Sequence, residues 1–432
     1  MTSSLARKGW AELKRALNLF FHPVRRLPPV LLALILCSLI GLFVDAAVEI
    51  LIQSDSLDLQ RLALVPAEGY QHLLTGGRVP HVRRTAVVEI NPDREFPDVS
   101  MLNPCEERAL LSELLRRLAT VHPSVIVVDK YFVASTCPPN DRGTEALLHT
   151  IRALRKDGQP IVVGRAAGAV PAASSNYEVQ SLAYLEPSLA FDGNAQEGLL
   201  NLARDTRLLP LEWTLYAGED QRTVIRKESL ALVAAKRAGL RPDLDARLTR
   251  LISRSEMPLI AFVGVEQWYR AEAHFYASDI LCGRATPPVR WQSCVAAEAA
   301  VPGPLAGKIV LIGEASPIDI HSTVVGNVPG VYLQANYIEA LLDGRYLVPA
   351  GSLASYGVGI GFVFFASQIL LHLSKWGSAL LMGGLCLATL LLLSITVNIF
   401  GYYIDPLPIS TMILAAFLSM LFAHQKPSRH VR

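Results

Sequence analysis

The chain has 432 residues, of which 51% are hydrophobic and only 18% are charged. This composition is too apolar for an ordinary soluble enzyme and excludes a freely soluble or disordered protein. The formal net charge is +2, so the chain lacks the basic surplus that holds nucleic acid by neutralising phosphates, and we expect no nucleic-acid partner.

The chain starts with a basic segment at residues 1–27, and the apolar stretch after it predicts a first transmembrane helix at 28–52. Apolar residues recur at helical spacing in the basic segment. It is therefore either an amphipathic helix on the lipid surface or an extension of the first span that only sets its orientation. A cleaved signal peptide is the alternative for the apolar stretch, but the acidic Asp45 and Glu49 beside its small residues favour an uncleaved anchor.

Residues 53–351 form a large insert that predicts one α/β domain, with a mostly parallel sheet and flanking helices. Apolar runs predict strands at 84–90, 124–129, 160–164, 259–263 and 308–313, and helical periodicity predicts helices at 106–121, 144–155, 229–238 and 332–342. The first three strands and two helices make a βαβαβ unit, whose strands are parallel. Residues 168–196 read as a loop or a β-rich excursion, and residues 314–329 as a turn.

Three further transmembrane helices are expected at 353–373, 378–400 and 404–423, with a short tail at 424–432. Four spans place both ends of the chain on one side of the membrane. Lys and Arg residues lie before the first span, between the second and third, and after the fourth, so the positive-inside rule predicts cytoplasmic termini. We therefore expect a multi-pass protein of a bacterial inner membrane with a periplasmic domain at 53–351.

The cysteines support an oxidising compartment for the insert. Four of the six cysteines fall in it, and of the three possible pairings we favour Cys105 with Cys137 and Cys282 with Cys294. A zinc site is the alternative, but no Cys-x-x-Cys or His-x-x-x-His spacing accompanies them, so we expect no metal.

Acidic residues stand at or just beyond the ends of several predicted strands: Glu89, Asp93, Asp129 and Glu314. Ligands of open parallel sheets bind outside the carboxyl ends of the strands, so these positions indicate a possible pocket, with Asp129 as the best candidate. The alternative for Asp129 is a carboxylate that caps the next turn or pairs with an arginine.

Motifs for catalysis and nucleotide binding are missing. Asp319 and His321 could belong to a hydrolase, yet no Gly-x-Ser-x-Gly elbow and no phosphate-binding glycine loop occurs outside the predicted spans. We therefore expect no catalytic residue and no cofactor.

Four segments of the insert form a recognisable set: AVVEI with the helix LLSELLRRL, then HPSVIVVDKYF, then GLLNLARDTRLLP with Asp205 and Arg207, and finally the stretch from Gly307 to Leu347, which includes Asp319. Together they resemble the CHASE2 family of bacterial membrane sensors, with Asp129 at the family's acidic position. The resemblance implies that Asp129, Asp205, Arg207 and Asp319 organise the domain or its ligand pocket.

Members of the family usually carry a cytoplasmic cyclase or kinase after the last span, whereas nine residues follow residue 423 in this sequence. The resemblance therefore implies a sensor that perceives an envelope signal and relays it to a separate membrane or cytoplasmic effector, with self-association possible. Two other hypotheses stay open: an accessory or scaffold subunit of an envelope complex without a small ligand, and a membrane-anchored hydrolase using Asp319 and His321.

Overall fold

The computed structural model describes most residues between 81 and 350 and scattered positions elsewhere. The described residues are 81–90, 104–138, 140–169, 183–185, 188–203, 205–216, 224–260, 262–283, 291, 301, 303–315, 319–323 and 325–350, with short stretches and single positions between 39 and 51 and between 357 and 409. The chain divides into two compact units. One comprises Ile52–Glu68 and Gly77–Val348 and contains the central sheet; the other comprises Met1–Leu51, Gly69–Gly76 and Pro349–Arg432.

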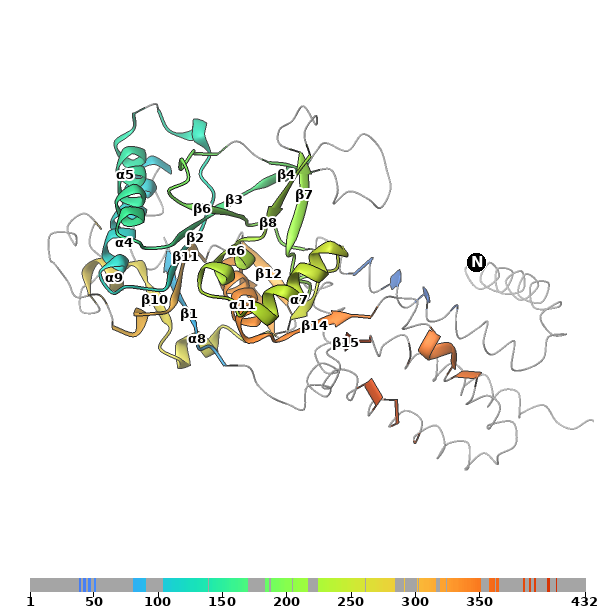
Figure 1. Ribbon diagram of the computed structural model, residues 1–432. Helices are drawn as coiled ribbons and strands as arrows, with labels where there is room; N and C mark the ends of the chain where they lie inside the picture. The colour runs from blue at the N-terminus through green and yellow to red at the C-terminus, as the bar shows by residue number, and fades with distance from the viewer. Residues whose placement is uncertain are drawn as a thin grey trace, which may run out of the picture. The chain divides into compact units, whose positions relative to one another are not determined.

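A six-stranded sheet forms the centre of the larger unit, with the strand order β10-β1-β11-β2-β3-β6 (Figure 1). The strands are β10 (His274–Tyr276), β1 (Thr85–Ile90), β11 (Ile309–Glu314), β2 (Val125–Asp129), β3 (Ile161–Arg165) and β6 (Gln196–Leu199). Every neighbouring pair is parallel. The central strands are buried on both faces, which explains why they read as continuous apolar runs instead of alternating patterns.

Helices cover both faces of this sheet, as Figure 1 shows. On one face α4 (Pro104–Ala119) packs against α5 (Arg142–Lys156) and α9 (Ala277–Cys282), and on the other α6 (Leu230–Arg237) packs against α11 (Gly330–Asp343). Every residue from the start of α11 to Leu342 is buried, so other parts of the domain surround this helix on all sides, and its polar residues Gln334, Asn336 and Glu339 are buried as well. The helix ends at Gly344, whose φ of 67° suits a left-handed C-terminal cap.

The chain also forms several smaller elements outside the central sheet. A four-stranded sheet has the order β4-β5-β7-β8, and its strands are β4 (Ala167–Ala169), β5 (Ala183–Leu185), β7 (Glu212–Tyr216) and β8 (Val224–Glu228). The remaining elements are the hairpin β12 (Ile320–Thr323) with β13 (Gly326–Pro329), the pair β9 (Leu259–Ile260) with β14 (Tyr346–Pro349), the helices α7 (Pro242–Ser253) and α8 (Glu266–Arg270), the 3₁₀ turns η2 (Ala134–Thr136) and η4 (Gly303–Leu305), and β15 (Tyr402–Tyr403).

The predicted α/β class and parallel sheet are confirmed, and the predicted strands and helices lie within a few residues of the observed ones. The prediction for 314–329 was incomplete, because this stretch, read as a turn, contains the antiparallel hairpin of β12 and β13. At 168–196 the β-rich alternative agrees with the structure, since β4 and β5 of the smaller sheet pair there. Strand β11 also lies between β1 and β2, an insertion that chain order does not reveal.

The predicted N-terminal segment 1–27 and tail 424–432 lie outside the described residues, as do most positions of the four predicted spans. Within the part of the chain that the structure describes, no helix is both long enough and apolar enough to cross a bilayer.

Candidate functional site

Two carboxylates lie on one face of the sheet, at the carboxyl ends of the two strands that flank β11. The register pairs Glu89 of β1 with Gly313 of β11, and Gly313 with Asp129 of β2. Side chains paired in this way on parallel strands point to the same face, so Glu89 and Asp129 flank Gly313. A Cβ on Gly313 would lie 2.7 Å from Val331 Cγ2 of α11. The missing side chain thus lets the first turn of α11 pack directly on β11, between the two carboxylates.

A pocket of about 340 Å³ opens beside Asp129, at the carboxyl edge predicted from the sequence. We call it the Asp129 pocket. Its lining residues come from the ends of β2, β6 and β11, from the segment before β12, and from the first turns of α11: Asp129, Lys130, Tyr131, Leu200, Leu202, Glu314, Asp319, Gly330 and Gln334. The two leucines form an apolar wall, and the charged side chains of the pocket come from β2, β11 and the segment before β12.

Burial raises the pKa of Asp129 to about 7, and the negative charge of Asp319 adds to this shift. Both effects disfavour the carboxylate, the first by removing water and the second by repulsion. Asp129 is therefore close to half protonated at neutral pH and responds strongly to any charge placed in the pocket. Perturbed groups of this kind in a cleft are typical of functional sites.

The other polar groups of the pocket are mostly held in place. Lys130 Nζ contacts Glu107 of α4 and lies 3.5 Å from Glu314 Oε2. Gln334, which is 3% exposed, donates from Nε2 to the main-chain oxygen of Leu200 at 3.1 Å. Its Oε1 is buried and has no hydrogen-bond partner among the described residues. A buried acceptor without a hydrogen bond lowers the stability of the folded protein unless a donor reaches it.

Glu89, on the far side of Gly313, belongs to a separate buried cluster. Tyr332 donates its hydroxyl proton to Glu89 Oε2 at 3.1 Å, and His274 Nδ1 lies 2.5 Å from the same hydroxyl oxygen. The hydroxyl proton is already given to Glu89, so Nδ1 carries the imidazole proton and Nε2 is left as a buried acceptor without a partner among the described residues. Burial lowers the pKa of His274 to about 4, against a smaller opposing effect of Asp279.

Of the four residues predicted to organise the domain or its pocket, Asp129 and Asp319 line the same pocket and Asp205 and Arg207 do not. Arg207 instead donates to Asp205 through Nε at 2.9 Å and Nη2 at 2.7 Å. Thr206 between them donates to the main-chain oxygen of Ser322, and its own carbonyl accepts from Tyr337 of α11. The ion pair therefore stiffens a turn that docks on β12 and α11.

His321 does not form a catalytic constellation with the neighbouring hydroxyl. Its Nε2 lies 2.9 Å from Asp319 Oδ1, while the hydroxyl of Ser322 contacts Asn327 Oδ1 at 3.3 Å. The geometry therefore gives an aspartate–histidine pair, of which Asp319 lines the Asp129 pocket, while the adjacent serine contacts Asn327.

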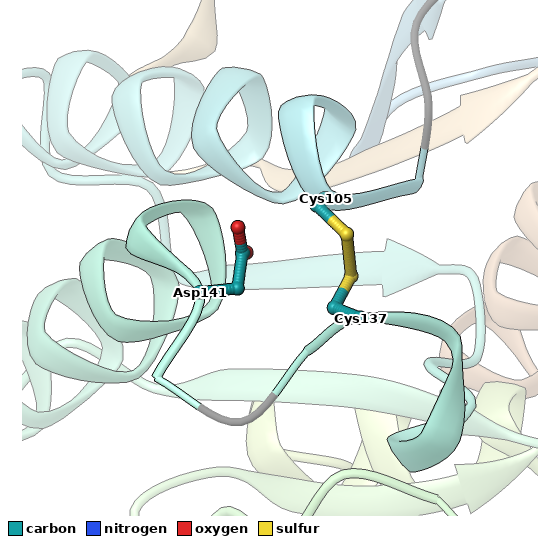
Figure 2. A group of neighbouring side chains, drawn as sticks. All are labelled: Cys105, Cys137 and Asp141. Carbon is teal, nitrogen blue, oxygen red and sulfur yellow. A yellow bond between two sulfur atoms is a disulfide. The ribbon is translucent and has the colours of Figure 1, made fainter.

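The predicted disulfide between Cys105 and Cys137 is confirmed, with a Cα–Cα distance of 5.7 Å (Figure 2). Asp141 lies beside it, and the three residues are the only group in the described part of the chain close enough to share a metal ion. Since both sulfurs are used in the disulfide, no thiolate remains to bind a metal. Cys282 is also disulfide-bonded, and its predicted partner Cys294 lies outside the described residues.

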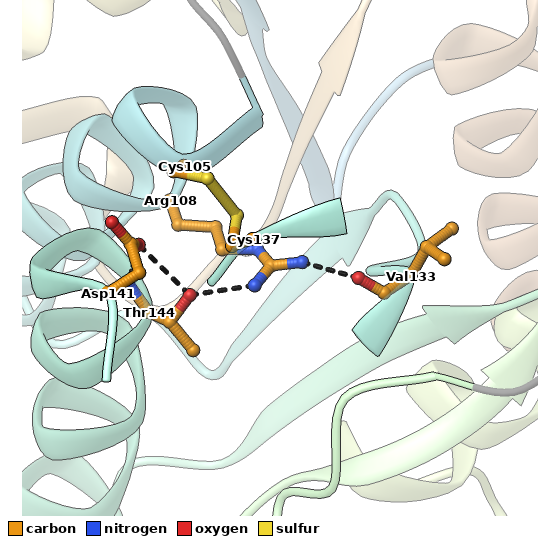
Figure 3. The surroundings of a disulfide bond; sticks show 6 residues. All are labelled: Cys105, Arg108, Val133, Cys137, Asp141 and Thr144. Carbon is orange, nitrogen blue, oxygen red and sulfur yellow. Dashed lines mark hydrogen bonds between the residues drawn. A yellow bond between two sulfur atoms is a disulfide. The ribbon is translucent and has the colours of Figure 1, made fainter. Parts of the chain in front are cut away.

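Figure 3 shows how the surroundings of this disulfide are fixed. Arg108, which is 2% exposed, donates to Thr144 Oγ1 at 2.7 Å and to the main-chain oxygen of Val133 at 2.6 Å. Asp141 caps α5 by accepting from the Thr144 amide at 2.8 Å. The disulfide and Arg108 thus join the first turns of α4 and α5 to the segment that follows β2. The Asp129 pocket lies at the end of the same strand.

Several pocket residues were not predicted from the sequence. Gln334 is one of three buried polar residues in the otherwise apolar helix 330–342, with Asn336 and Glu339, and such interruptions are the signal that could have identified it. Leu200 and Leu202 follow β6, a strand whose sequence has no clear alternation. The cluster of Glu89, His274 and Tyr332 joins residues far apart in sequence and gives no local signal.

Comparison with known families matches residues 47–369 to the CHASE2 domain. No curated protein and no solved structure shows significant similarity to the chain. CHASE2 domains are extracellular sensory domains, and the match includes the whole central sheet and every residue of the Asp129 pocket. Since the matched residues make up about three quarters of the sequence, the chain belongs to the CHASE2 domain family.

Proposed function

We propose that this chain is a membrane-anchored sensor subunit whose CHASE2 domain binds an envelope signal in the Asp129 pocket. The transmembrane helices then relay the bound state to a separate partner protein. The observation that carries the proposal is the pocket itself. It lies at the carboxyl edge of a parallel sheet in a sensory domain, and it contains an aspartate whose pKa is raised to about 7.

The first predicted span, 28–52, supports membrane anchoring. Its described residues are helical, and four large apolar side chains among them are more than half exposed: Leu39, Leu42, Phe43 and Ile50. Apolar side chains that project from a helix without covering protein are favourable where lipid surrounds the helix. The proposed topology also includes spans at 353–373, 378–400 and 404–423, with both termini in the cytoplasm.

The disulfide between Cys105 and Cys137 supports a location of the domain outside the cytoplasm, because such bonds persist in oxidising compartments. The distribution of Lys and Arg around the spans favours the same orientation in a bacterial inner membrane. A membrane-impermeant maleimide tests it on two variants of the full chain. Glu145→Cys, on the exposed face of α5, is expected to be labelled from outside the inner membrane, whereas Ser4→Cys is expected to be labelled only after the membrane is opened.

Relay to a partner is tested by quantitative capture from the native membrane. The tagged full chain, its Asp129→Asn variant and the control Asp157→Asn are purified in gentle detergent, and the bound proteins are measured by mass spectrometry. Asp157 is exposed at the C-terminal end of α5, on the other face of the sheet, so it controls for the loss of one carboxylate. We expect an effector such as a cyclase or kinase whose yield changes in Asp129→Asn alone. Envelope components captured equally by all three proteins would indicate a scaffold instead.

A further inference from the structure

We propose that the Asp129 pocket takes a small organic cation, with an ammonium or guanidinium group among its acidic residues and an apolar portion against Leu200 and Leu202. This inference rests on the proposed function, since it specifies the ligand class of the same site. It is carried by the charge of the pocket, by one unsatisfied buried acceptor, and by the spacing of the carboxylates.

The pocket has an excess of negative groups. Asp129, Glu314 and Asp319 line it, and Lys130 is the one cationic side chain among its described lining residues. That lysine is already engaged by Glu107 and Glu314. Asp319 is also in contact with His321 at 2.9 Å. The carboxylates still outnumber the cationic side chains around the pocket, so an entering cation is attracted and an anion is repelled.

Gln334 supplies an independent observation. Its side chain lines the pocket, is 3% exposed and uses its amide nitrogen to donate to Leu200. The amide oxygen is left as a buried acceptor without a partner among the described residues. An ammonium or guanidinium group has several N–H donors and no acceptor, so it can satisfy this oxygen and a carboxylate together.

The first turn of α11 does not offer an anion site. A Cβ on Gly330 would lie 2.2 Å from Asp319 Oδ2, so the carboxylate of Asp319 already lies against the start of the helix. The Gly330 amide donates to the main-chain oxygen of Asp319 at 3.0 Å. The positive end of the helix dipole is thus occupied by a protein group of opposite charge.

The spacing of the carboxylates favours an organic cation over a metal ion. In the described part of the chain, the acidic residues of the pocket do not come close enough together to ligate one ion. An extended cation does not need such convergence, because its N–H groups point in different directions. The volume of about 340 Å³ suits a small molecule, at the lower end of ligand pockets.

Binding of a cation is expected to release a proton from Asp129. The titratable side chains that line the pocket with this carboxyl are Asp319, Glu314, Lys130 and Tyr131, and Asp319 in turn contacts His321. Burial and the charge of Asp319 raise the pKa of Asp129 to about 7. A bound cation favours the carboxylate form. Affinity is therefore expected to rise about tenfold between about pH 6 and about pH 8, because the ionised fraction rises by that factor.

The test uses the full chain in detergent and three four-carbon probes: butylammonium, 1-butanol and butyrate, with butylguanidinium as the guanidinium probe. Isothermal titration calorimetry in buffers of different ionisation enthalpy measures both affinity and released protons. We expect the ammonium or guanidinium probe to bind at least about tenfold more tightly than the neutral and anionic probes. Asp129→Asn is expected to weaken binding and remove the pH dependence, Gln334→Leu to weaken it about fivefold or more, and Asp157→Asn to leave it unchanged.

Two results overturn the inference. One is a lack of binding by both cationic probes up to about 10 mM, which is as weak as so small a probe is expected to bind. The other is equal or tighter binding of butanol or butyrate. If that binding still depends on Gln334, the pocket remains a ligand site and the proposed sensory function survives. Loss of the proposed function would appear separately, as partner capture that is the same in Asp129→Asn and the wild type. Unfolding curves of each variant without probe establish that it is folded.

Discussion

Replacing Asp129 with asparagine is expected to stabilise the protein at neutral and higher pH. The pKa of this carboxyl is raised from 3.8 to about 7 in the folded state, mainly by burial. Between these values the folded protein keeps a proton that the unfolded chain gives up. The free energy of unfolding therefore falls as pH rises through this window. Most buried carboxylates that are paired behave in the opposite way and lose stability in acid.

The magnitude follows from the size of the shift. About three pH units at about 1.4 kcal/mol each give an upper bound of about 4 kcal/mol. Asp129 borders a pocket and is partly exposed, so water reduces this value to about 1–3 kcal/mol. Asparagine keeps the shape of the side chain and has no charge. The variant should match the wild type near pH 4 and exceed it by about 1–3 kcal/mol near pH 8.

The assay is unfolding of the full chain in detergent, followed by tryptophan fluorescence, at a series of pH values. Trp268 is fully buried against Tyr332 of α11, so its emission reports the unfolding of the domain. Asp157→Asn is the matched control and should track the wild type throughout. A stability difference between Asp129→Asn and the wild type that stays constant with pH would refute the argument that burial raises the pKa of Asp129.

Three further predictions concern the residues around the pocket. His274→Gln should remove a loss of stability in acid. Because the pKa of His274 is lowered to about 4, the free energy of unfolding of the wild type should fall by about 2 kcal/mol between about pH 6.5 and about pH 4. Parallel plots of this free energy against pH for the two proteins would contradict the prediction. Gly313→Ala should destabilise by about 1–3 kcal/mol in chemical denaturation, since its Cβ would clash with α11; Gly303→Ala, which meets open space, should change stability by less than about 0.5 kcal/mol. Replacing Cys105 and Cys137 together with serine should lower stability by about 3 kcal/mol in a non-reducing thermal scan, whereas an unchanged unfolding midpoint would mean that the bond contributes nothing.

The position of Asp129 could be predicted because parallel strands present their carboxyl ends at one edge. A continuous apolar run followed by an acidic residue is enough to place that residue there. The same reasoning placed Glu314 and Glu89 at this edge. It could not show that β11 lies between β1 and β2, because strand order in space is decided by packing and not by chain order. As a result, the separation of Glu89 from Asp129 by Gly313 was not predictable.

The other polar residues in and near the pocket are brought to their positions by tertiary packing, so the sequence pattern predicts their roles less well. Gln334 lies in a helix that is buried on every side, so helical periodicity assigns it no special face. Asp205 and Arg207 were grouped with the pocket residues by the family resemblance, whereas their closest contact is with each other. Spacing along the chain could not distinguish a local ion pair from a pair that lines a cavity.

Hydrogen–deuterium exchange of the full chain, with and without the tightest cationic probe, tests most directly whether the Asp129 pocket is the sensory site. Bound ligand should slow exchange at three places that are distant in sequence: the end of β2, the segment at 200–202 and the first turns of α11. Asp129→Asn should lose this protection, and Asp157→Asn should keep it. Protection confined to other parts of the chain, or no protection at saturating probe, would contradict the assignment of the pocket.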